Sequence, residues 1–551
     1  MRPGALSGPT TSRSLNAAAR QAHAVVFPRW SSVPTPGTVW RPALRPARPT
    51  FPRLTAPCNA TSGSTQGAEG DMDPKRRRLE SAGSPVHSLI EAGNSGSGEV
   101  LAAHTSGDLF KVPGGLICTD HHIKTALDYT GEVPGVIDIF VREVVASNKK
   151  SQDLPCLLFL AGGPGFSAPR PFESSSWLKS AVNLFRVILM DQRGTGRSSP
   201  ITVNNLAKKG TPQQQAQYLS FFRADSIVRD AEQVRKTLVP SDAYAGRWSI
   251  IGQSFGGFCA TTYLSLYPNS LIEVMITGGV PPDITQPCTA DAVYRALYRR
   301  VILQNQRYYE RFPSDAKLVR RIVTWLLAQP GGCLRLASGT LLTPRALQLL
   351  GLTTLGMSGG FERLHFMLES FFDEEGDVNP AFVKAWEHQM AWDTNPLYVL
   401  LHEAIYCQGA ASNWSAHRIR ETEFKDTFHA EVALASGRPV FFTGEMVYPW
   451  MFEDFAFLRP YKEAADLVAK KADWGPLYDE AMLRENRPPV AAAVYYEDMY
   501  VDLELSQPTA SRIRGFRQWV TSEYKHSGIR DDGGRIFDRL INMVRDQILV
   551  D

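Results

Sequence analysis

The segment with the clearest chemical potential in this chain is a serine between two glycines. Residues 252–256 read Gly-Gln-Ser-Phe-Gly, directly after the apolar run 248–251 and before the helical pattern 258–267. A serine on such a sharp strand-to-helix turn has strained backbone angles, and bulkier flanking residues would collide with the turn. The pattern in this context predicts that Ser254 is a nucleophile.

A nucleophilic serine also needs hydrogen-bond donors where negative charge develops on the attacked carbonyl oxygen. One expected donor is the backbone N–H of Phe255, the residue after the serine. The other is expected from the Gly-Gly-Pro-Gly turn at 162–165, which follows the apolar run 154–160. Because glycine lets the backbone approach a substrate closely, we predict Gly163 as that donor. The alternative is that this turn is an ordinary loop.

The serine must lose its proton to a general base that a third group orients. Six histidines follow Ser254, and His526 is the one that lies beyond the last predicted strand. In this arrangement the acid comes between the serine and the histidine along the chain. Asp498 follows the end of a predicted strand and is the expected acid, with Glu497 and Asp502 as alternatives.

Alternating strands and helices are predicted to position these residues. Short apolar runs closed by glycine turns suit strands buried on both faces of a parallel sheet, with helices as the crossovers. Such runs occupy 154–160, 185–190, 248–251 and 273–277, and a helical pattern spans 226–238. Further strands are expected over 117–125, 136–145, 489–496 and 515–524, and a closing amphipathic helix over 535–550. The expected fold class is α/β, with an α/β-hydrolase fold.

Aromatic-rich helical patterns such as 294–312 and 361–372 interrupt this alternation, and they predict a helical cap domain inserted into the hydrolase core. The expected organisation is a disordered extension over 1–98, the first part of the core over 99–283, the cap over 284–485 and the second part of the core over 486–551.

The N-terminal extension has the composition of a targeting segment. It is rich in Pro, Gly, Ser, Ala and Arg, and eight arginines precede its first acidic residue, Glu69. Arginine-rich, acid-free segments of this kind are typical of transit peptides, so we expect a chloroplast or mitochondrial location. The alternative is a tail with no address, or translation from Met72, either of which would leave a cytoplasmic protein. The basic run 74–78 resembles a nuclear-import signal, a weaker hypothesis.

Composition argues against several other classes of function. The formal net charge is +3, and the chain without its arginine-rich start is mildly acidic, so nucleic acid is not an expected partner. No apolar run reaches the length of a bilayer span, and no membrane association is expected. Seven cysteines without C-x-x-C spacing predict neither a disulfide framework nor a zinc site. We expect no metal and no cofactor.

Taken together, several motifs resemble those of the proline iminopeptidase (prolyl aminopeptidase) family. The motifs are Gly-Gly-Pro-Gly at 162–165, Asp-Gln-Arg-Gly-Thr-Gly-Arg-Ser at 191–198 and Gly-Gln-Ser-Phe-Gly-Gly at 252–257. The segments 495–502 and 523–530 match a longer subgroup of that family, and the likeness covers about residues 100–551.

This resemblance implies an activity and a substrate site. The family releases N-terminal proline from short peptides through an acyl-enzyme, without a metal or cofactor, and carboxylates of its cap bind the free amino group of the substrate. Glu403 and Glu445 resemble those carboxylates, and a buried ammonium does need paired negative charge. Tyr406 and Trp450, with Phe452, are then expected to line an apolar slot for the proline ring.

Two positions depart from the family pattern. Ala161 stands where a histidine often precedes Gly-Gly-Pro-Gly, and Phe255 stands where many members have tryptophan. Both positions border the expected pocket, so they bear on the preference for proline rather than on hydrolysis itself. The alternatives are an esterase or amidase of the same fold, or a binding protein that has the fold without turnover.

Overall fold

The structure is a computed structural model that describes residues 103–172, 176–284 and 288–548, all within one compact unit, Glu80–Asp551. The expected targeting segment, Met72 and the basic run 74–78 lie outside the described residues. None of the helices in the described ranges combines the length and the apolar composition that a membrane span needs.

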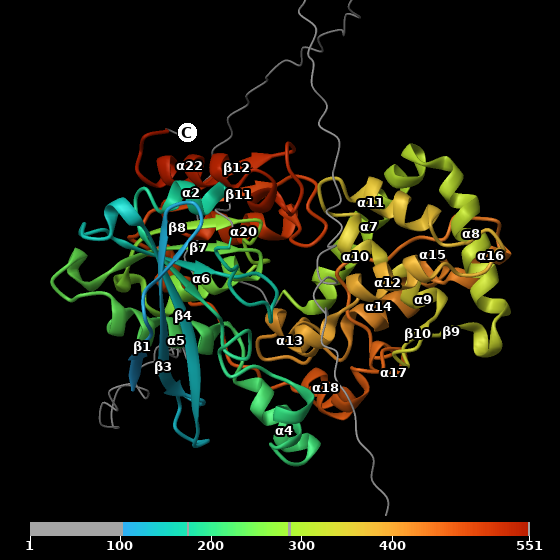
Figure 1. The fold of residues 1–551 in the computed structure, drawn as a ribbon, viewed down its shortest axis with the longest axis horizontal. Helices are drawn as coiled ribbons and strands as arrows, with labels where there is room; N and C mark the ends of the chain where they lie inside the picture. Colours follow the sequence, from blue (N-terminus) through green and yellow to red (C-terminus); the bar gives the residue numbers. More distant parts are fainter. Residues whose placement is uncertain (1–102, 173–175, 285–287, 549–551) are drawn as a thin grey trace, which may run out of the picture. The chain divides into compact units, whose positions relative to one another are not determined.

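A mixed sheet forms the centre of this unit (Figure 1). Its strands are β1 His104–Ser106, β2 Phe110–Val112, β3 Leu116–Ala126, β4 Val136–Ala146, β5 Cys156–Leu160, β6 Arg186–Met190, β7 Trp248–Gln253, β8 Leu271–Thr277, β11 Val490–Tyr495 and β12 Phe516–Thr521. The order across the sheet is β1-β3-β4-β6-β5-β7-β8-β11-β12, and β2 pairs with β3. Strands from β6 to β12 in this order run parallel, and β1 to β4 form the antiparallel end.

Two apolar layers sandwich the sheet, because successive side chains of a strand point to opposite faces. Leu158 and Leu160 of β5 belong to one buried cluster, whereas Leu157 and Phe159 belong to the other. Helices α5 Ala224–Leu238 and α6 Phe255–Leu266 cover the first face. Helices α2 Ser176–Ala181 and α22 Gly533–Val544 pack together over the second. The buried parallel strands therefore carry apolar residues on both faces, as their continuous apolar runs predict.

A long helical segment separates β8 from β11 and gathers to one side of the sheet, where Figure 1 draws it from yellow to orange. Its helices are α7 Ala290–Arg311, α8 Pro313–Ala328, α9 Pro344–Gln348, α10 Leu350–Thr354, α11 Gly360–Glu369, α12 Pro380–Gln389, α13 Pro396–Leu401, α14 Ser415–Glu423, α15 Lys425–Phe428, α16 Ala430–Ala435, α17 Met451–Asp454, α18 Lys462–Lys470 and α19 Glu480–Arg484. A small antiparallel pair, β9 Leu334–Arg335 and β10 Leu341–Leu342, interrupts them and was not expected from the sequence.

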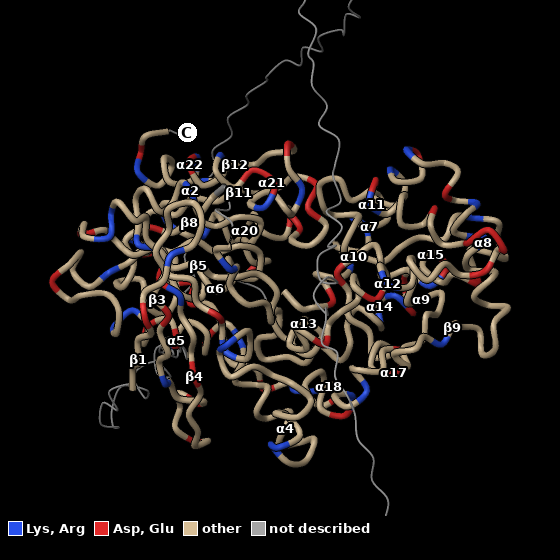
Figure 2. The backbone as a smooth tube through the Cα atoms, in the orientation of Figure 1, with Lys and Arg blue, Asp and Glu red and all other residues tan. Residues whose placement is uncertain are grey.

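The remaining α-helices are α3 Val203–Ala207, α4 Pro212–Ser220, α20 Leu503–Arg512 and α21 Gly528–Asp531. Among them, α4 packs against α18, α20 against β12 and α21 against α22. Acidic and basic residues are interleaved over the sheet and over the helical segment alike (Figure 2).

The C-terminal helix ends earlier than the sequence predicts. The expectation of a helix to residue 550 is wrong at its last turn, since α22 ends at Val544 and residues 545–548 form turns. Asp546 has a φ of 56°, which an α-helix does not tolerate, and Arg545 turns away to pair with Glu273 at 2.8 Å. This ion pair ties the end of the helix to β8.

Candidate active site

Ser254 occupies a strained turn between β7 and α6. Its φ and ψ are 54° and −124°, a combination that non-glycine residues rarely adopt. The two flanking glycines have no room for a side chain. A Cβ on Gly252 would lie 2.3 Å from the carbonyl oxygen of Gly256, and a Cβ on Gly256 would lie 2.0 Å from that of Leu160. The turn can therefore form only with glycine at both positions, which explains the Gly-x-Ser-x-Gly spacing.

His526 and Asp498 complete a chain of hydrogen bonds with this serine. His526 Nε2 lies 2.9 Å from Ser254 Oγ, and His526 Nδ1 lies 2.7 Å from Asp498 Oδ2. His526 lies in the loop after β12 and Asp498 in the loop after β11, and all three residues are buried. The other oxygen of Asp498 accepts hydrogen bonds from the backbone N–H groups of Tyr500 and Val501, which fix the carboxylate. The structure thus brings together the three residues expected from the sequence.

The alternative acids point elsewhere. Glu497 pairs with Arg307 of α7 at 2.6 Å. Asp502 pairs with Arg300 of α7 at 2.8 Å, and its carboxylate also accepts the N–H of Leu505 at the start of α20. Both side chains contact the helical segment or a helix end, so Asp498 is the acid that the loop presents to His526.

The expected oxyanion donors flank the serine. Phe255 is the first residue of α6, so its N–H has no partner within the helix, and the positive end of the helix dipole lies there as well. The glycine turn that follows β5 lies against the serine, since a Cβ on Gly162 would lie 3.1 Å from Ser254 Cβ. The next N–H along, that of Gly163, makes no hydrogen bond to another described residue. Its role as a donor remains a prediction.

The 191–198 turn is hydrogen-bonded to the backbone just before the glycine turn. Gln192 Nε2 donates to the carbonyl of Ala161 at 3.0 Å. Arg193 is fully buried, and its guanidinium donates to both oxygens of Asp230 on α5. These contacts give the turn a structural role, and they place it directly beside the residues around the serine.

The two expected cap carboxylates are both buried in the helical segment. Glu403 lies in a 3-10 helix, Glu403–Tyr406, and accepts the N–H groups of Ser415 and Ala416 at the start of α14. Glu445 accepts the hydroxyl of Tyr398 at 2.9 Å. Burial raises the pKa of each carboxyl to about 7. The charge of His526 lowers the pKa of the Glu445 carboxyl and that of Asp498 raises it, so Glu445 interacts electrostatically with two triad residues.

The two expected pocket aromatics have different surroundings. The Tyr406 ring lies 6.0 Å from the ring of Phe258 on α6, one turn from the serine. Trp450 instead stacks on Tyr448 at 5.1 Å and lies under the guanidinium of Arg345. Neither of these ring contacts is with a triad residue, and a place for Trp450 beside the proline ring stays a prediction. Phe452 likewise packs against Trp414 within the helical segment.

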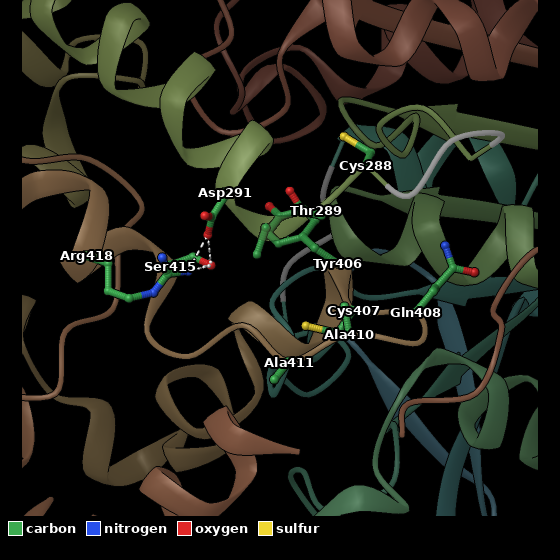
Figure 3. A pocket seen from close by; sticks show the side chains of 11 residues that line it. Cys288, Thr289, Asp291, Tyr406, Cys407, Gln408, Ala410, Ala411, Ser415 and Arg418 are labelled. Atoms are coloured by element: carbon green, nitrogen blue, oxygen red, sulfur yellow. Dashed lines mark hydrogen bonds and ion pairs between the residues drawn. The ribbon is translucent and has the colours of Figure 1, made fainter. Parts of the chain in front are cut away.

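Tyr406 also lines a pocket of ≈ 130 Å³. Its other walls are Cys288, Thr289, Ala290, Asp291, Cys407, Gln408, Ala410, Ala411, Ser415 and Arg418 (Figure 3). Ser415 connects this pocket to Glu403, because its N–H donates to the Glu403 carboxylate while its hydroxyl donates to Asp291. Arg418 pairs with the same aspartate at 2.6 Å. Ser415 therefore lies between the pocket and the Glu403 carboxylate.

Three further buried residues border the site and were not singled out from the sequence. Tyr500 stacks on the imidazole of His526 with ring centroids 4.5 Å apart. The Tyr294 hydroxyl and both ring nitrogens of His402 have no hydrogen-bond partner among the described residues. His402 lies beside Glu445, at 3.8 Å between Nε2 and Oε2, and burial lowers its pKa to about 3. These positions follow from packing across distant segments, for which no local sequence signal exists.

Within the described ranges, no group of three or more His, Cys, Asp or Glu side chains is arranged to hold a metal ion. The cysteines there are free thiols.

A serine on a strand-to-helix turn of a largely parallel sheet, followed along the chain by an acid and a histidine, defines a serine hydrolase of the α/β-hydrolase fold. A family model described as "alpha/beta hydrolase fold" matches residues 155–346. The chain is 48% identical over 442 residues to a proline iminopeptidase from Aeromonas sobria, which covers 80% of this chain and 100% of that protein. The chain belongs to the proline iminopeptidase family.

A second relative is more distant. The proline iminopeptidase aneH of Aspergillus aculeatus is 35% identical over 446 residues, covering 79% of this chain and 95% of that protein. Among solved structures, a proline iminopeptidase of Mycobacterium smegmatis is 13% identical with a TM-score of 0.36, covering 74% of this chain and 95% of that chain.

Proposed function

We propose that this protein is a prolyl aminopeptidase that releases N-terminal proline from short peptides. The observation that carries the proposal is the pairing of a hydrogen-bonded Ser254–His526–Asp498 chain with a buried carboxylate, Glu445, within electrostatic reach of it. An esterase acting on neutral acyl groups gains nothing from a buried carboxylate, whereas a peptide amino terminus supplies the positive charge that such a group lacks.

The proposed reaction begins with attack of Ser254 Oγ on the carbonyl carbon of the first residue. His526 Nε2 takes the hydroxyl proton, and Asp498 holds the imidazole in the required orientation and stabilises its positive charge. The N–H groups of Phe255 and Gly163 stabilise the oxyanion. His526 then protonates the departing amine, and a water molecule hydrolyses the acyl-enzyme by the same route in reverse.

The cap carboxylates select the amino terminus. Glu445 and Glu403 bind the substrate ammonium, and Tyr406 contacts the proline ring. Because the pKa of each carboxyl is about 7 in the free protein, part of the population is protonated at neutral pH. The bound ammonium stabilises the ionised form, so substrate affinity increases as pH rises through about 7.

The test is hydrolysis of proline, alanine and leucine naphthylamides and of a short-chain ester by the wild type and by Ser254→Ala and Glu445→Gln. We expect fast proline release that is lost in Ser254→Ala, and a KM raised about tenfold or more in Glu445→Gln, since an ammonium loses a charged partner. The matched control is Glu453→Gln, which changes an exposed glutamate of α17 and should leave the kinetics unaltered. Ester cleavage without proline release would contradict the proposal.

We also propose that residues 1–98 direct the chain to a chloroplast or mitochondrion, on the basis of their arginine-rich, acid-poor composition. A fluorescent protein fused after residue 98 should enter the organelle, and a fusion that begins at Met72 should stay in the cytoplasm. Cytoplasmic fluorescence from both fusions would contradict this location.

A further inference from the structure

The two loops that carry Asp498 and His526 are bonded to the helical segment as well as to the sheet. The hydroxyl of Tyr500 donates to the carbonyl of Leu352 on α10 at 2.5 Å. Arg307 and Arg300 of α7 pair with Glu497 and Asp502 of the same loop, as described above. On the histidine loop, Ser527 Oγ accepts the N–H of Ser358 at 3.2 Å. The helical segment therefore contributes directly to the position of the acid and the base.

Lys525, the residue before His526, makes the most extensive of these contacts. Its Nζ donates to Gln304 Oε1 of α7 at 3.3 Å and to the carbonyl of Leu355, just past α10, at 3.0 Å. The same ammonium lies 4.0 Å from the ring centroid of Phe361 on α11. One side chain of the core thus contacts three parts of the helical segment.

The surroundings of Lys525 are those of a group placed for its hydrogen bonds rather than for an ion pair. Among the described residues, no carboxylate lies within ion-pair distance of its Nζ. Burial lowers the pKa of Lys525 to about 8. The charged groups that face it are Glu497 beside the catalytic acid, Arg307 and Arg311 on α7, and Glu362 on α11, while α10 carries no charge.

We propose that Lys525 is a positioning residue that fixes the His526 loop to α7, α10 and α11 and so keeps the imidazole aligned with Ser254. The bond from Lys525 to the Leu355 carbonyl is charge-assisted and joins the loop after β12 to the helical segment. Loss of the charge weakens this bond and the contact with Phe361 together. His526 then samples orientations in which Nε2 no longer accepts the serine proton. The helical segment that carries Glu445 is in this way coupled to the base.

This proposal rests on the proposed roles of Ser254 and His526, but not on the proline specificity. A readout independent of the substrate amine is the rate at which a small fluorophosphonate modifies the serine, because that reaction needs the aligned Ser254–His526 pair and no ammonium. It separates the alignment of the base from the binding of the peptide. The peptidase proposal can therefore fail while this test still decides the role of Lys525.

The experiment compares Lys525→Met and Lys525→Arg with the wild type, with Lys462→Met as the matched control. Lys462 is an exposed lysine of α18 that pairs with Glu453. We expect Lys525→Met to reduce kcat for proline naphthylamide and the fluorophosphonate rate by the same factor, about tenfold or more, because small misplacements of a base are costly. KM should change by less than about twofold, since the amine site is untouched. Lys525→Arg should recover most of both rates, and Lys462→Met should match the wild type.

The pH profile of the fluorophosphonate reaction gives a test in the unaltered protein. The wild-type rate should fall as pH rises through about 8, where Lys525 loses its proton. The Lys525→Arg rate should not fall there, because a guanidinium stays charged. This comparison decides the question even if Lys525→Met does not fold.

Three outcomes would overturn the proposal. The first is a Lys525→Met protein with a lower melting temperature but wild-type rates per folded molecule. The second is a wild-type profile that is flat around pH 8 together with a Lys525→Arg rate no higher than that of Lys525→Met. The third is equal modification of Ser254→Ala and wild type. The fluorophosphonate would then not react at Ser254, and this serine would not be the nucleophile that Lys525 is proposed to align with His526. Wild-type fluorophosphonate reactivity without proline release would contradict only the peptidase proposal.

Discussion

At the scale of single residues, the site depends on a serine whose backbone conformation is tolerated only because its neighbours lack side chains. The strain at Ser254 is held by the bond of its N–H to the Thr277 carbonyl on β8 and by the close contact of α6 with β5. The hydroxyl reaches His526 as a consequence of this turn. A substitution that shifts α6 by a fraction of an ångström is therefore expected to change both the reactivity of Ser254 and the stability of the fold.

We predict that Gly256→Ala impairs both properties. The new Cβ would meet the carbonyl oxygen of Leu160 at 2.0 Å, and a backbone atom cannot turn away as a side chain could. We expect a loss of about 1–3 kcal/mol in the free energy of unfolding and a fall in the fluorophosphonate rate. Urea unfolding monitored by tryptophan fluorescence and a labelling time course check these. Gly475→Ala is the control, because its Cβ would meet nothing within 4 Å. Equal stability of the two variants would contradict the prediction.

At the scale of elements, the 191–198 turn connects β3, α5 and the end of α4 to the glycine turn beside the serine. Arg193 donates to Asp230 on α5 and to the carbonyls of Ala126, Leu127 and Phe221. All of its donors are thus used within a fully buried environment. Such an arginine acts as a structural link, and its removal leaves a buried carboxylate and several carbonyls without a donor.

We predict that Arg193→Met destabilises the fold by about 3–5 kcal/mol, the usual loss when one partner of a buried pair is removed. The control is Arg229→Met, which removes a half-buried arginine of α5 that pairs with Asp225 within the helix. That variant should lose no more than about 0.5 kcal/mol. Thermal unfolding by circular dichroism measures both. A loss for Arg193→Met as small as that of the control would contradict the structural role of this turn.

At the scale of the whole molecule, the fold buries ionisable groups whose charged forms are destabilised by burial. Their pKa values therefore differ between the folded and unfolded protein. The Glu445 pKa is about 7 when folded and near 4.5 when unfolded. Between these values the folded protein binds more protons than the unfolded chain, so this group makes the fold less stable as pH rises from 4.5 to 7. His402 acts in the opposite sense, because its lowered pKa makes the fold less stable as pH falls from 6.5 toward 3.

We predict that Glu445→Gln is more stable than the wild type at pH 8, by about 2 kcal/mol, and that the difference closes toward pH 5. A glutamine retains an oxygen for the Tyr398 hydroxyl but carries no charge to bury. Melting temperatures across this pH range measure the difference, with Glu453→Gln again as the control. A constant difference at all pH values would show that the gain does not come from ionisation.

The catalytic turn and the parallel strands are predictable from the sequence because their determinants are local. A glycine on each side of Ser254 indicates that the backbone packs too closely there for a side chain. The continuous apolar runs in β5 to β8 indicate strands that are buried on both faces. His526 is predictable because it is the last histidine after the last strand. The early end of α22 was missed, since it depends on pairing of Arg545 with a residue of β8 far away in the chain.

Tertiary structure alone decided the rest of the site. The position after the strand favours Asp498 but leaves Glu497 and Asp502 as alternatives, and arginines of α7 pair with these two alternatives in the structure. Trp450 is expected from the family resemblance to line the pocket, and the ring contacts that the structure shows for it are with Tyr448 and Arg345 of the helical segment. The sequence by itself determined the nucleophile, the base and the sheet that carries them, because these follow from short-range sterics and periodicity. Which carboxylate serves the base, and which helices hold its loop, were determined by contacts between segments more than a hundred residues apart.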